Sequence, residues 1–180
     1  MNILHLSAVK NLGGGEKHIE NLCLELGFLA PEIVNIVLCP HNSQFEKHLK
    51  KTDLKVITAH LDFKMDPRYF LKLVKICRKQ KIELIHIHDS TALTLAIMGD
   101  YLDDLPPFIF SKKTSFPIQA RKSTLYIYNY PKLKKILCVS EKTKSVSEEN
   151  ISEHEKVQGI YHATSLRDKA TENEFSIKDH

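Results

Sequence analysis

The sequence has no long apolar run and none of the marks of an exported protein. Its apolar segments fall well short of the about 20 residues that a helix needs to cross a bilayer. Residues 1–6 lead directly into a strand-like run, with no basic segment and no cleavage site. We therefore expect no signal peptide and a cytoplasmic location.

The sequence also lacks two kinds of motif: nucleotide-binding fingerprints and paired cysteines. The sequence contains neither G-x-x-x-x-G-K-[ST] nor G-x-G-x-x-G, so it lacks both the P-loop and the dinucleotide-binding fingerprint. It also has no C-x-x-C pair. Its four cysteines are far apart, and we expect them to be reduced and buried: Cys23, Cys39, Cys77 and Cys138.

The sequence has few glycines, and half of them are adjacent to one another. Three of the six glycines are consecutive, Gly13, Gly14 and Gly15, between the strand-like run 2–6 and an amphipathic stretch from Glu16. A helix N-terminus has unpaired N–H groups and about half a positive charge. Glycine also lets a phosphate or sugar approach the backbone closely. The segment therefore predicts an anion-binding turn, with an ordinary tight turn as the alternative.

The charge is unevenly distributed. Lysine and arginine exceed the acids by seven over residues 1–140, whereas the acids are in excess by three over residues 141–180. The stretch 64–81 alone holds seven basic residues and one acid. This pattern indicates either an ordinary solvated helix face or an attraction to anionic lipid or phosphorylated ligands. Aromatic residues are not interleaved with the basic ones, which argues against nucleic acid as a partner.

Strand-like and helical segments alternate along most of the chain. The strand-like runs are 2–6, 33–38, 55–59, 84–88, 108–111, 135–140 and 157–161. Several are apolar on both faces, and the stretches between them have apolar residues at helical spacing, as in 19–26, 70–77 and 91–102. We therefore predict an α/β fold, with one doubly wound, mostly parallel sheet and helices on both faces. Ligands of such sheets bind at the carboxyl ends of the strands.

A histidine pair ends the fourth predicted strand. His86 and His88 point to the same side of that strand, and His88, Asp89 and Ser90 lie at its carboxyl end, on the edge that also holds the glycines. A histidine there could orient or deprotonate a sugar hydroxyl, so His88 and Asp89 are our candidate catalytic residues, and Ser90 is the expected N-cap of the next helix. Two alternatives remain open: a metal site completed by His60 or His162, and histidines that are simply polar core groups.

Further polar residues follow the carboxyl ends of other predicted strands. Ser140 ends a strand and can cap the helix after it, next to Glu141. We expect the following to lie at the cleft or to meet an acceptor: Glu16, Lys17, Lys112, Lys113, Arg121, Ser140 and Glu141.

The order of these segments resembles that of a known family. The matching segments are Ile3-Leu4-His5-Leu6, Gly13-Gly14-Gly15-Glu16-Lys17-His18, Ile85-His86-Ile87-His88-Asp89, Ile136-Leu137-Cys138-Val139-Ser140-Glu141 and the run 156–163. Together they resemble the N-terminal, acceptor-side domain of a family 4 glycosyltransferase of the GT-B class. The resemblance covers nearly the whole chain.

The resemblance implies two Rossmann-like domains that face a cleft. Residues 1–165 would form the first domain, and 166–180 would be a linker or the start of a second domain that is missing. The enzyme would transfer a sugar, with retention of configuration, from a nucleotide-sugar donor to a saccharide or glycolipid acceptor, without metal or cofactor. Gly13, Gly14 and Gly15 would lie by the donor diphosphate and His88 by the transferring sugar or the acceptor hydroxyl. We expect the chain alone to be inactive, and to associate with the cytoplasmic face of an anionic membrane.

Two other functions remain alternatives. The chain could be a stand-alone α/β module that binds a nucleotide or phosphate without catalysis. It could also be a metal-dependent hydrolase that uses the His-x-His-Asp segment 86–89.

Overall fold

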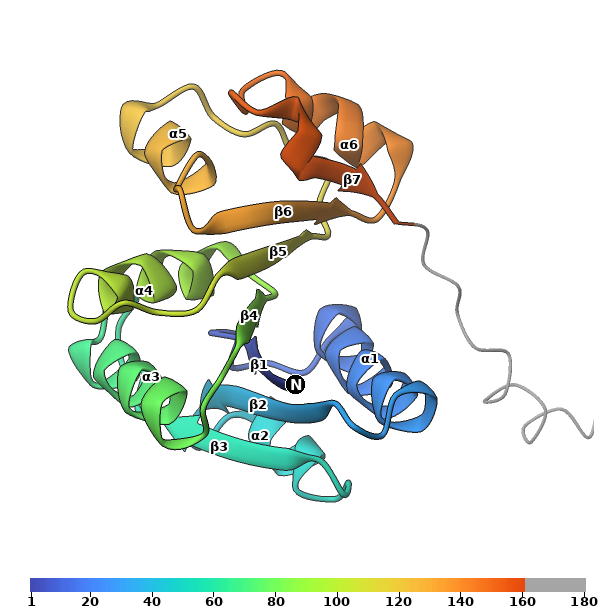
Figure 1. The fold of residues 1–180 in the computed structure, drawn as a ribbon, viewed down its shortest axis with the longest axis vertical. Helices are drawn as coiled ribbons and strands as arrows, with labels where there is room; N and C mark the ends of the chain where they lie inside the picture. The colour runs from blue at the N-terminus through green and yellow to red at the C-terminus, as the bar shows by residue number, and fades with distance from the viewer. Residues whose placement is uncertain (161–180) are drawn as a thin grey trace, which may run out of the picture.

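A computed structural model describes residues 1–160 of the chain, which form one parallel sheet with helices on both faces (Figure 1). The strands are β1 (Asn2–Leu6), β2 (Val34–Pro40), β3 (Lys55–Ala59), β4 (Leu84–Ile87), β5 (Phe108–Lys112), β6 (Leu133–Cys138) and β7 (Val157–Gly159). The helices are α1 (Gly14–Leu29), α2 (Gln44–Leu49), α3 (Pro67–Lys79), α4 (Ser90–Asp100), α5 (Lys122–Tyr128), α6 (Glu141–Glu148) and the short 3-10 helix η1 (His154–Lys156). Within these residues, none of the helices has the length and apolar character to cross a membrane.

The seven strands lie in the order β3-β2-β1-β4-β5-β6-β7, and every neighbouring pair is parallel. The chain starts in the middle of the sheet, runs outward to β3, returns to β4 beside β1 and then runs outward in the other direction. The strand order thus reverses between β1 and β4, which is where doubly wound sheets form their ligand-binding crevice. The predicted fold class is confirmed.

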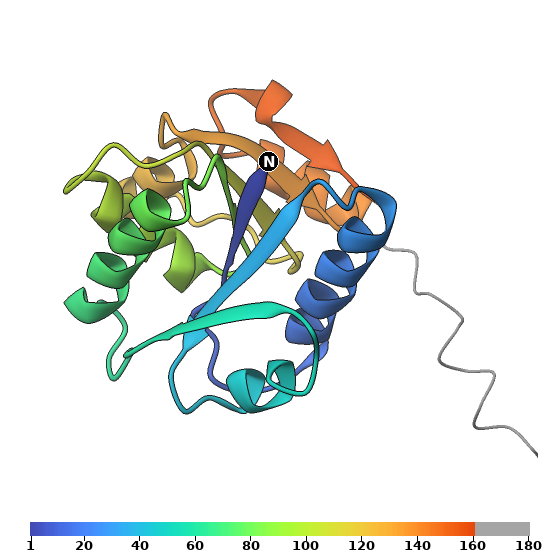
Figure 2. The same ribbon diagram turned by 60° about the horizontal axis from the view of Figure 1, so that its bottom comes forward.

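Helices cover both faces of the sheet. On one face, apolar residues of α1 and α2 pack on β2, and on the other a larger core lies under α3, α4 and α5. Figure 2 shows α1 (blue) and α3 (green) on opposite sides of the strands. Because each face is covered, the central strands are buried on both sides and consist mostly of Ile, Leu, Val and Phe. All four cysteines are buried and unpaired, as predicted.

The ends of several elements differ from the prediction. Helix α4 begins at Ser90, one residue early, and its N-cap is Asp89, whose carboxylate accepts from the Ala92 N–H at 2.8 Å. Ser90 is therefore not the cap, because the preceding carboxylate reaches the free N–H groups first. The Ser140 cap of α6 is confirmed by its hydrogen bond from the Thr143 N–H, at 3.2 Å.

The ends of three strands, β4, β6 and β7, also differ from the prediction. β6 spans Leu133–Cys138 rather than 135–140, since Ser140 is already the cap of α6. β4 ends at Ile87, so His88 is the first residue after the strand. The predicted last strand, 157–161, is shorter, and its final residue lies outside the described part of the chain, as do His162 and the expected linker 166–180.

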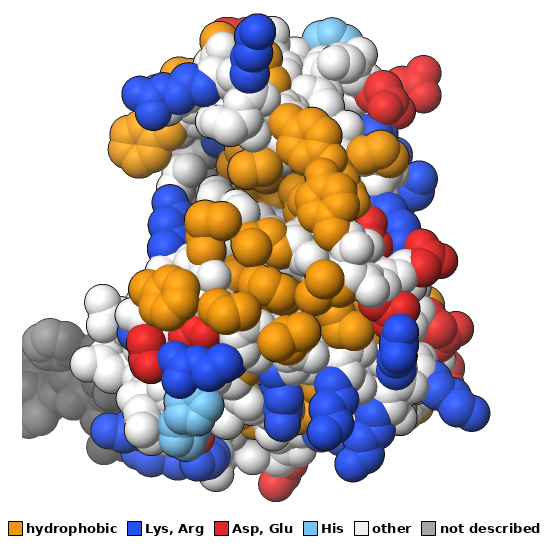
Figure 3. Space-filling view, turned by 90° about the vertical axis from the view of Figure 1, so that its left-hand side faces the viewer, with side chains coloured by type: hydrophobic (Ala, Val, Ile, Leu, Met, Phe, Trp, Pro, Cys, Tyr) orange, Lys and Arg blue, Asp and Glu red, His pale blue; other side chains and the backbone are white. Residues whose placement is uncertain are grey.

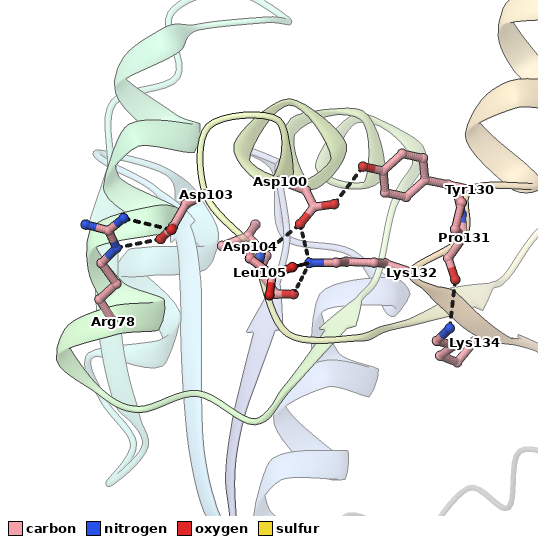
Figure 4. Close-up of polar contacts among 9 residues, drawn as sticks. All are labelled: Arg78, Asp100, Asp103, Asp104, Leu105, Tyr130, Pro131, Lys132 and Lys134. Carbon is pink, nitrogen blue, oxygen red and sulfur yellow. Dashed lines mark hydrogen bonds and ion pairs between the residues drawn. The ribbon is translucent and has the colours of Figure 1, made fainter.

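At the sheet edge opposite the crevice, a polar cluster ties the α4–β5 connection to β6 (Figure 4). Lys132 Nζ donates to Asp100 Oδ1 at 2.6 Å, to Asp104 and to the Leu105 carbonyl oxygen at 2.5 Å. The Tyr130 hydroxyl donates to the other oxygen of Asp100 at 2.6 Å. Burial alone would raise the pKa of Asp100, but the hydrogen bonds from Lys132 and Tyr130 outweigh it and hold that pKa below its usual value.

We predict that Lys132→Met lowers the free energy of unfolding by about 2 kcal/mol near neutral pH, because it leaves the half-buried Asp100 carboxylate without its cation. A carboxyl with a depressed pKa stabilises the fold above its unfolded pKa, and this contribution disappears as the pH falls. The difference between the two proteins should therefore shrink below about pH 4. Urea unfolding at several pH values measures it.

Lys134→Met is the matched control. Lys134 is exposed, and among residues 1–160 its Nζ donates only to the Pro131 carbonyl oxygen, at 2.9 Å. Its loss should therefore change stability by less than about 0.5 kcal/mol. Equal losses in both variants would show that the cluster contributes nothing specific.

Candidate functional site

The three glycines lie at the start of helix α1, which begins at Gly14 rather than at the predicted Glu16, so Gly14 and Gly15 form part of its first turn. Gly13 is the N-cap, with φ −145° and ψ −170°, and none of the three has a positive φ. The backbone conformation therefore does not require glycine here. A Cβ on Gly14 would meet nothing within 4 Å, so the space above the first turn of α1 is open. What glycine provides at this position is close access to the helix N-terminus.

Glu16 closes part of that turn. It is buried, and its Oε2 accepts from the Gly13 N–H at 3.0 Å, as the acidic residue of a capping box does. Its negative charge also lies in the first turn of α1, where the helix dipole stabilises it.

Lys113 connects the end of β5 to the glycine turn. Its Nζ donates to the Gly15 carbonyl oxygen at 2.8 Å, across 98 positions of sequence. Burial lowers the pKa of Lys113 to about 8, against the attraction of Glu16 and Asp89. The side chain is therefore a cation at neutral pH, and it lies beside the open N-terminus of α1.

Lys112 has a different role. Its Nζ donates to the carbonyl oxygens of Thr114 and Phe116 at 2.6 and 2.7 Å, so it holds the loop after β5 in place. Burial lowers its pKa as well.

Three histidines lie close together at the junction of β1 and β4: His5, His86 and His88. His5 and His86 are register partners on the two strands, and the His86 and His88 rings lie 4.2 Å apart between centroids. All three are at most 8% exposed. Burial lowers the pKa of His5 to about 4, that of His86 to about 3 and that of His88 well below its usual value. All three rings are therefore neutral at physiological pH.

Hydrogen bonds engage four of the six nitrogens of these rings. His5 Nε2 lies 3.1 Å from Asn35 Oδ1, and His5 Nδ1 lies 3.2 Å from His88 Nε2. His86 Nε2 lies 2.8 Å from Ser111 Oγ. His88 Nδ1 has no partner, and it is the one such buried side-chain nitrogen or oxygen within residues 1–160.

Asp89 is held by the backbone. Its two carboxylate oxygens accept from the N–H groups of Ala8, at 2.7 Å, and Ala92, at 2.8 Å. Burial raises its pKa, although these hydrogen bonds oppose the shift. Asp89 thus clamps the β1–α1 loop to the start of α4 and fixes the backbone that carries His88.

A pocket of about 230 Å³ brings six of the predicted site residues together. They are Gly15, Glu16, His88, Asp89, Lys112 and Lys113. The other six predicted residues do not line this pocket. Gly13 and Gly14 are the N-cap and the first residue of α1, Lys17 is exposed, Arg121 is the N-cap of α5, Ser140 caps α6, and Glu141 lies by Gly159. The prediction missed the lining residues Phe110, Ser111, Thr114 and Tyr128. It also missed His5 and Asn35, which connect to His88 by hydrogen bonds.

The histidines that could hold a metal ion in the structure are not the set predicted from the sequence. His5, His86 and His88 each offer a ligand atom, and these atoms lie within 4.8 Å of one another. His60 does not join them, because it packs on His41 with ring centroids 5.1 Å apart. The other predicted ligand, His162, lies outside the described residues.

The sequence matches a known protein family over most of its length. The model of glycosyltransferase family 4 matches residues 12–167, which is most of the chain. The chain belongs to glycosyltransferase family 4. The matched range includes the glycine turn, the histidine segment and the loop that carries Lys113. A search of curated protein sequences gives no match.

Solved structures show the same fold as this family 4 domain. A glycosyltransferase from Rickettsia africae superposes with a TM-score of 0.72 at 20% identity, and covers 92% of this chain and 44% of its own. HepE of Anabaena, solved with UDP-glucose, gives 0.70 at 16%, covering 93% and 45%. The lipopolysaccharide outer core galactosyltransferase WaaB gives 0.69 at 15%, covering 92% and 47%. The chain is thus an N-terminal GT-B domain and spans less than half of these proteins.

The glycine turn gives a matched pair of variants. We predict that Gly14→Ala leaves the free energy of unfolding unchanged or raises it by up to about 1 kcal/mol, because alanine favours the helix and finds open space. Gly13→Ala should lower it by about 1 kcal/mol, since its Cβ would lie 3.2 Å from Glu16 Oε2 and disturb the cap. Thermal and urea unfolding of both variants test this order; the reverse order would contradict the described turn.

Proposed function

We propose that this chain is the acceptor-side domain of a retaining glycosyltransferase that transfers a sugar from a nucleotide-sugar donor to a saccharide or glycolipid acceptor. The observation that carries the proposal is the meeting of an open helix N-terminus, a cationic lysine and a neutral histidine in one pocket at the switch point of the sheet. The similar structure of HepE is a complex with UDP-glucose, which supports a nucleotide sugar as the donor.

The pocket offers positive charge for a diphosphate. The first turn of α1 presents N–H groups and the helix dipole, Gly13, Gly14 and Gly15 let the phosphate approach, and the ammonium of Lys113 lies 2.8 Å from the Gly15 carbonyl. These groups can stabilise a departing nucleoside diphosphate without a metal ion, by fixed charges and dipoles in a partly dry site.

His88 provides an acceptor for a hydroxyl. Its ring is neutral because burial lowers its pKa, and its Nδ1 has no partner within residues 1–160. In this proposal, that nitrogen receives a hydrogen bond from a hydroxyl of the transferring sugar or of the acceptor. Asp89 acts through its clamp on the backbone around His88.

The proposal also assigns most of the donor site to a second domain. The chain spans less than half of each of the three similar structures described above, and a GT-B cleft lies between two such domains. We therefore expect this chain alone to bind the donor weakly and to transfer no sugar.

Binding of UDP tests the proposal. We predict that the chain binds UDP with a Kd of about 1 mM, equivalent to about 4 kcal/mol, and that uridine binds more weakly. Lys113→Met should raise the Kd for UDP about tenfold, as expected for loss of a charge-assisted contact. Gly14→Ala should raise it by a similar factor, about tenfold, because the added methyl group would keep the phosphate from the N-terminus of α1. Titrations followed by NMR measure these affinities.

The control is Lys51→Met, an exposed lysine after α2 that does not line the pocket. It should bind UDP as the unchanged chain does. Equal affinity in all variants would contradict the proposal, and a micromolar Kd with no need of a second domain would favour the stand-alone binding module.

The pH dependence follows from Lys113. Its pKa of about 8 means that the ammonium loses its proton between pH 7 and 9, whereas the phosphates of UDP are fully ionised above about pH 7. Affinity for UDP should therefore fall over this range. The profile of Lys113→Met should be flat, and a fall of the same size in that variant would assign the effect to another group.

A second surface of the domain carries exposed apolar side chains that suit contact with a lipid membrane. Large exposed apolar side chains lie on α3 (Leu71), at the end of α4 (Tyr101, Leu102) and on α5 (Tyr126). Figure 3 shows hydrophobic side chains gathered over this side of the molecule, with basic side chains along its lower border. We propose that this face rests on an anionic membrane, where lysines would add electrostatic attraction.

We predict that the chain sediments with vesicles containing phosphatidylserine and that changing the exposed lysines Lys72, Lys75 and Lys79 to Glu abolishes this binding. Each lysine near an anionic surface contributes about 1 kcal/mol. Vesicles of phosphatidylcholine alone serve as the control. Undiminished binding of the triple variant would contradict the proposed membrane face, and would leave the proposal for the pocket untouched.

A further inference from the structure

A chain of polar groups runs from helix α1 to the pocket. Asn35 Nδ2 lies 3.4 Å from the carbonyl oxygen of Cys23, and Asn35 Oδ1 lies 3.1 Å from His5 Nε2. His5 Nδ1 lies 3.2 Å from His88 Nε2. The last atom is His88 Nδ1, which has no partner in the described part of the chain and belongs to a ring that lines the pocket.

The carbonyl oxygen of Cys23 sets the direction of this chain. A carbonyl can only accept, so Asn35 donates to it from Nδ2 and turns its own oxygen toward His5. His5 must then donate from Nε2. A neutral imidazole carries one N–H, so His5 Nδ1 accepts, and His88 donates to it from Nε2. The remaining nitrogen, His88 Nδ1, is therefore a bare lone pair.

We propose that Asn35 and His5 are positioning residues that hold His88 as its Nε2–H tautomer, so that Nδ1 accepts a hydrogen bond from a sugar hydroxyl. The hydroxyl as ligand rests on the proposed function, whereas the tautomer follows from the hydrogen bonds alone. Burial supports the neutral state that the argument needs, because it lowers the pKa of both His5 and His88.

The tautomer matters for the chemistry of the hydroxyl. A hydroxyl that donates to His88 Nδ1 turns its hydrogen toward the ring and leaves its oxygen lone pairs free for attack or for other donors. With the opposite tautomer, the ring would donate to the oxygen and occupy a lone pair. An unpartnered buried acceptor is also costly, and a ligand that supplies a donor removes that cost.

The same atoms leave little room for a metal. Both ring nitrogens of His5, Nε2 of His86 and Nε2 of His88 already face hydrogen-bond partners. Because both nitrogens of His5 are engaged, an ion held by the three histidines would have to break at least one hydrogen bond of His5, and the ligand atoms would have to draw together from separations of up to 4.8 Å.

Nitrogen NMR of the histidine rings tests the tautomer directly. Long-range proton–nitrogen spectra of the 15N-labelled chain at pH 8 distinguish a protonated from an unprotonated ring nitrogen. We expect His88 in the unchanged chain to be protonated on Nε2 only. Protonation on Nδ1, or a mixture of tautomers, would overturn the proposal without any variant being needed.

Two variants of Asn35 test the positioning role. Asn35→Leu removes the acceptor for His5, so we expect a second tautomer of His88 to become populated. Asn35→Asp keeps an acceptor of the same size and should restore the single Nε2–H tautomer at pH 8, where His5 stays neutral. A single, unchanged tautomer in a folded Asn35→Leu protein would show that Asn35 does not set it.

Ligand binding separates this inference from the proposed function. Asn35→Leu should weaken binding of UDP-glucose about fivefold, the worth of one neutral hydrogen bond, and leave UDP affinity unchanged. If the unchanged chain does not bind UDP-glucose, the proposed function fails, and the NMR result still decides the tautomer. Stoichiometric binding of added Zn²⁺ that shifts the ring signals of His5, His86 and His88 together would overturn the relay in favour of a metal site.

Discussion

The parallel pairing of β1 with β4 holds the site together. Every other pair of neighbouring strands joins consecutive strands of the sequence, but β1 and β4 are separated by two strands and three helices. The chain leaves these two strands toward opposite edges of the sheet, so their carboxyl ends border a crevice. The register sets His5 beside His86, and the loops that follow carry the glycines and His88.

Burial then sets the charge of each group at this junction. The histidines lose their protons at neutral pH because a buried imidazolium is costly, whereas Lys113 keeps its proton because Glu16 and Asp89 lie nearby. The pocket therefore combines the lysines Lys112 and Lys113 with the carboxyl groups of Glu16 and Asp89 and the neutral ring of His88. Asp89 supports the site indirectly, because it accepts backbone hydrogen bonds that fix the loops around it. This distribution suits a ligand with an anionic group and several hydroxyls.

Much of the fold could be predicted from the sequence, and about half of the site. Alternating short apolar runs and amphipathic stretches gave the parallel sheet, and glycines or polar residues after strands marked the carboxyl edge. Arg121, Ser140 and Glu141 also follow strands, yet they lie outside the pocket, because that edge is longer than one pocket. Local patterns also misplaced the cap of α4, where Asp89 and Ser90 are both suitable residues and only the backbone path decides between them.

The sequence by itself determined the α/β class, the glycine turn at a helix N-terminus and the pairing of His86 with His88 on one side of a strand. These follow from periodicity and residue type, which act over a few neighbouring positions. Only the tertiary structure placed Lys113 on Gly15 and connected Asn35 through His5 to His88. Such contacts depend on strand order and register, which bring together residues that lie 30 to 98 positions apart.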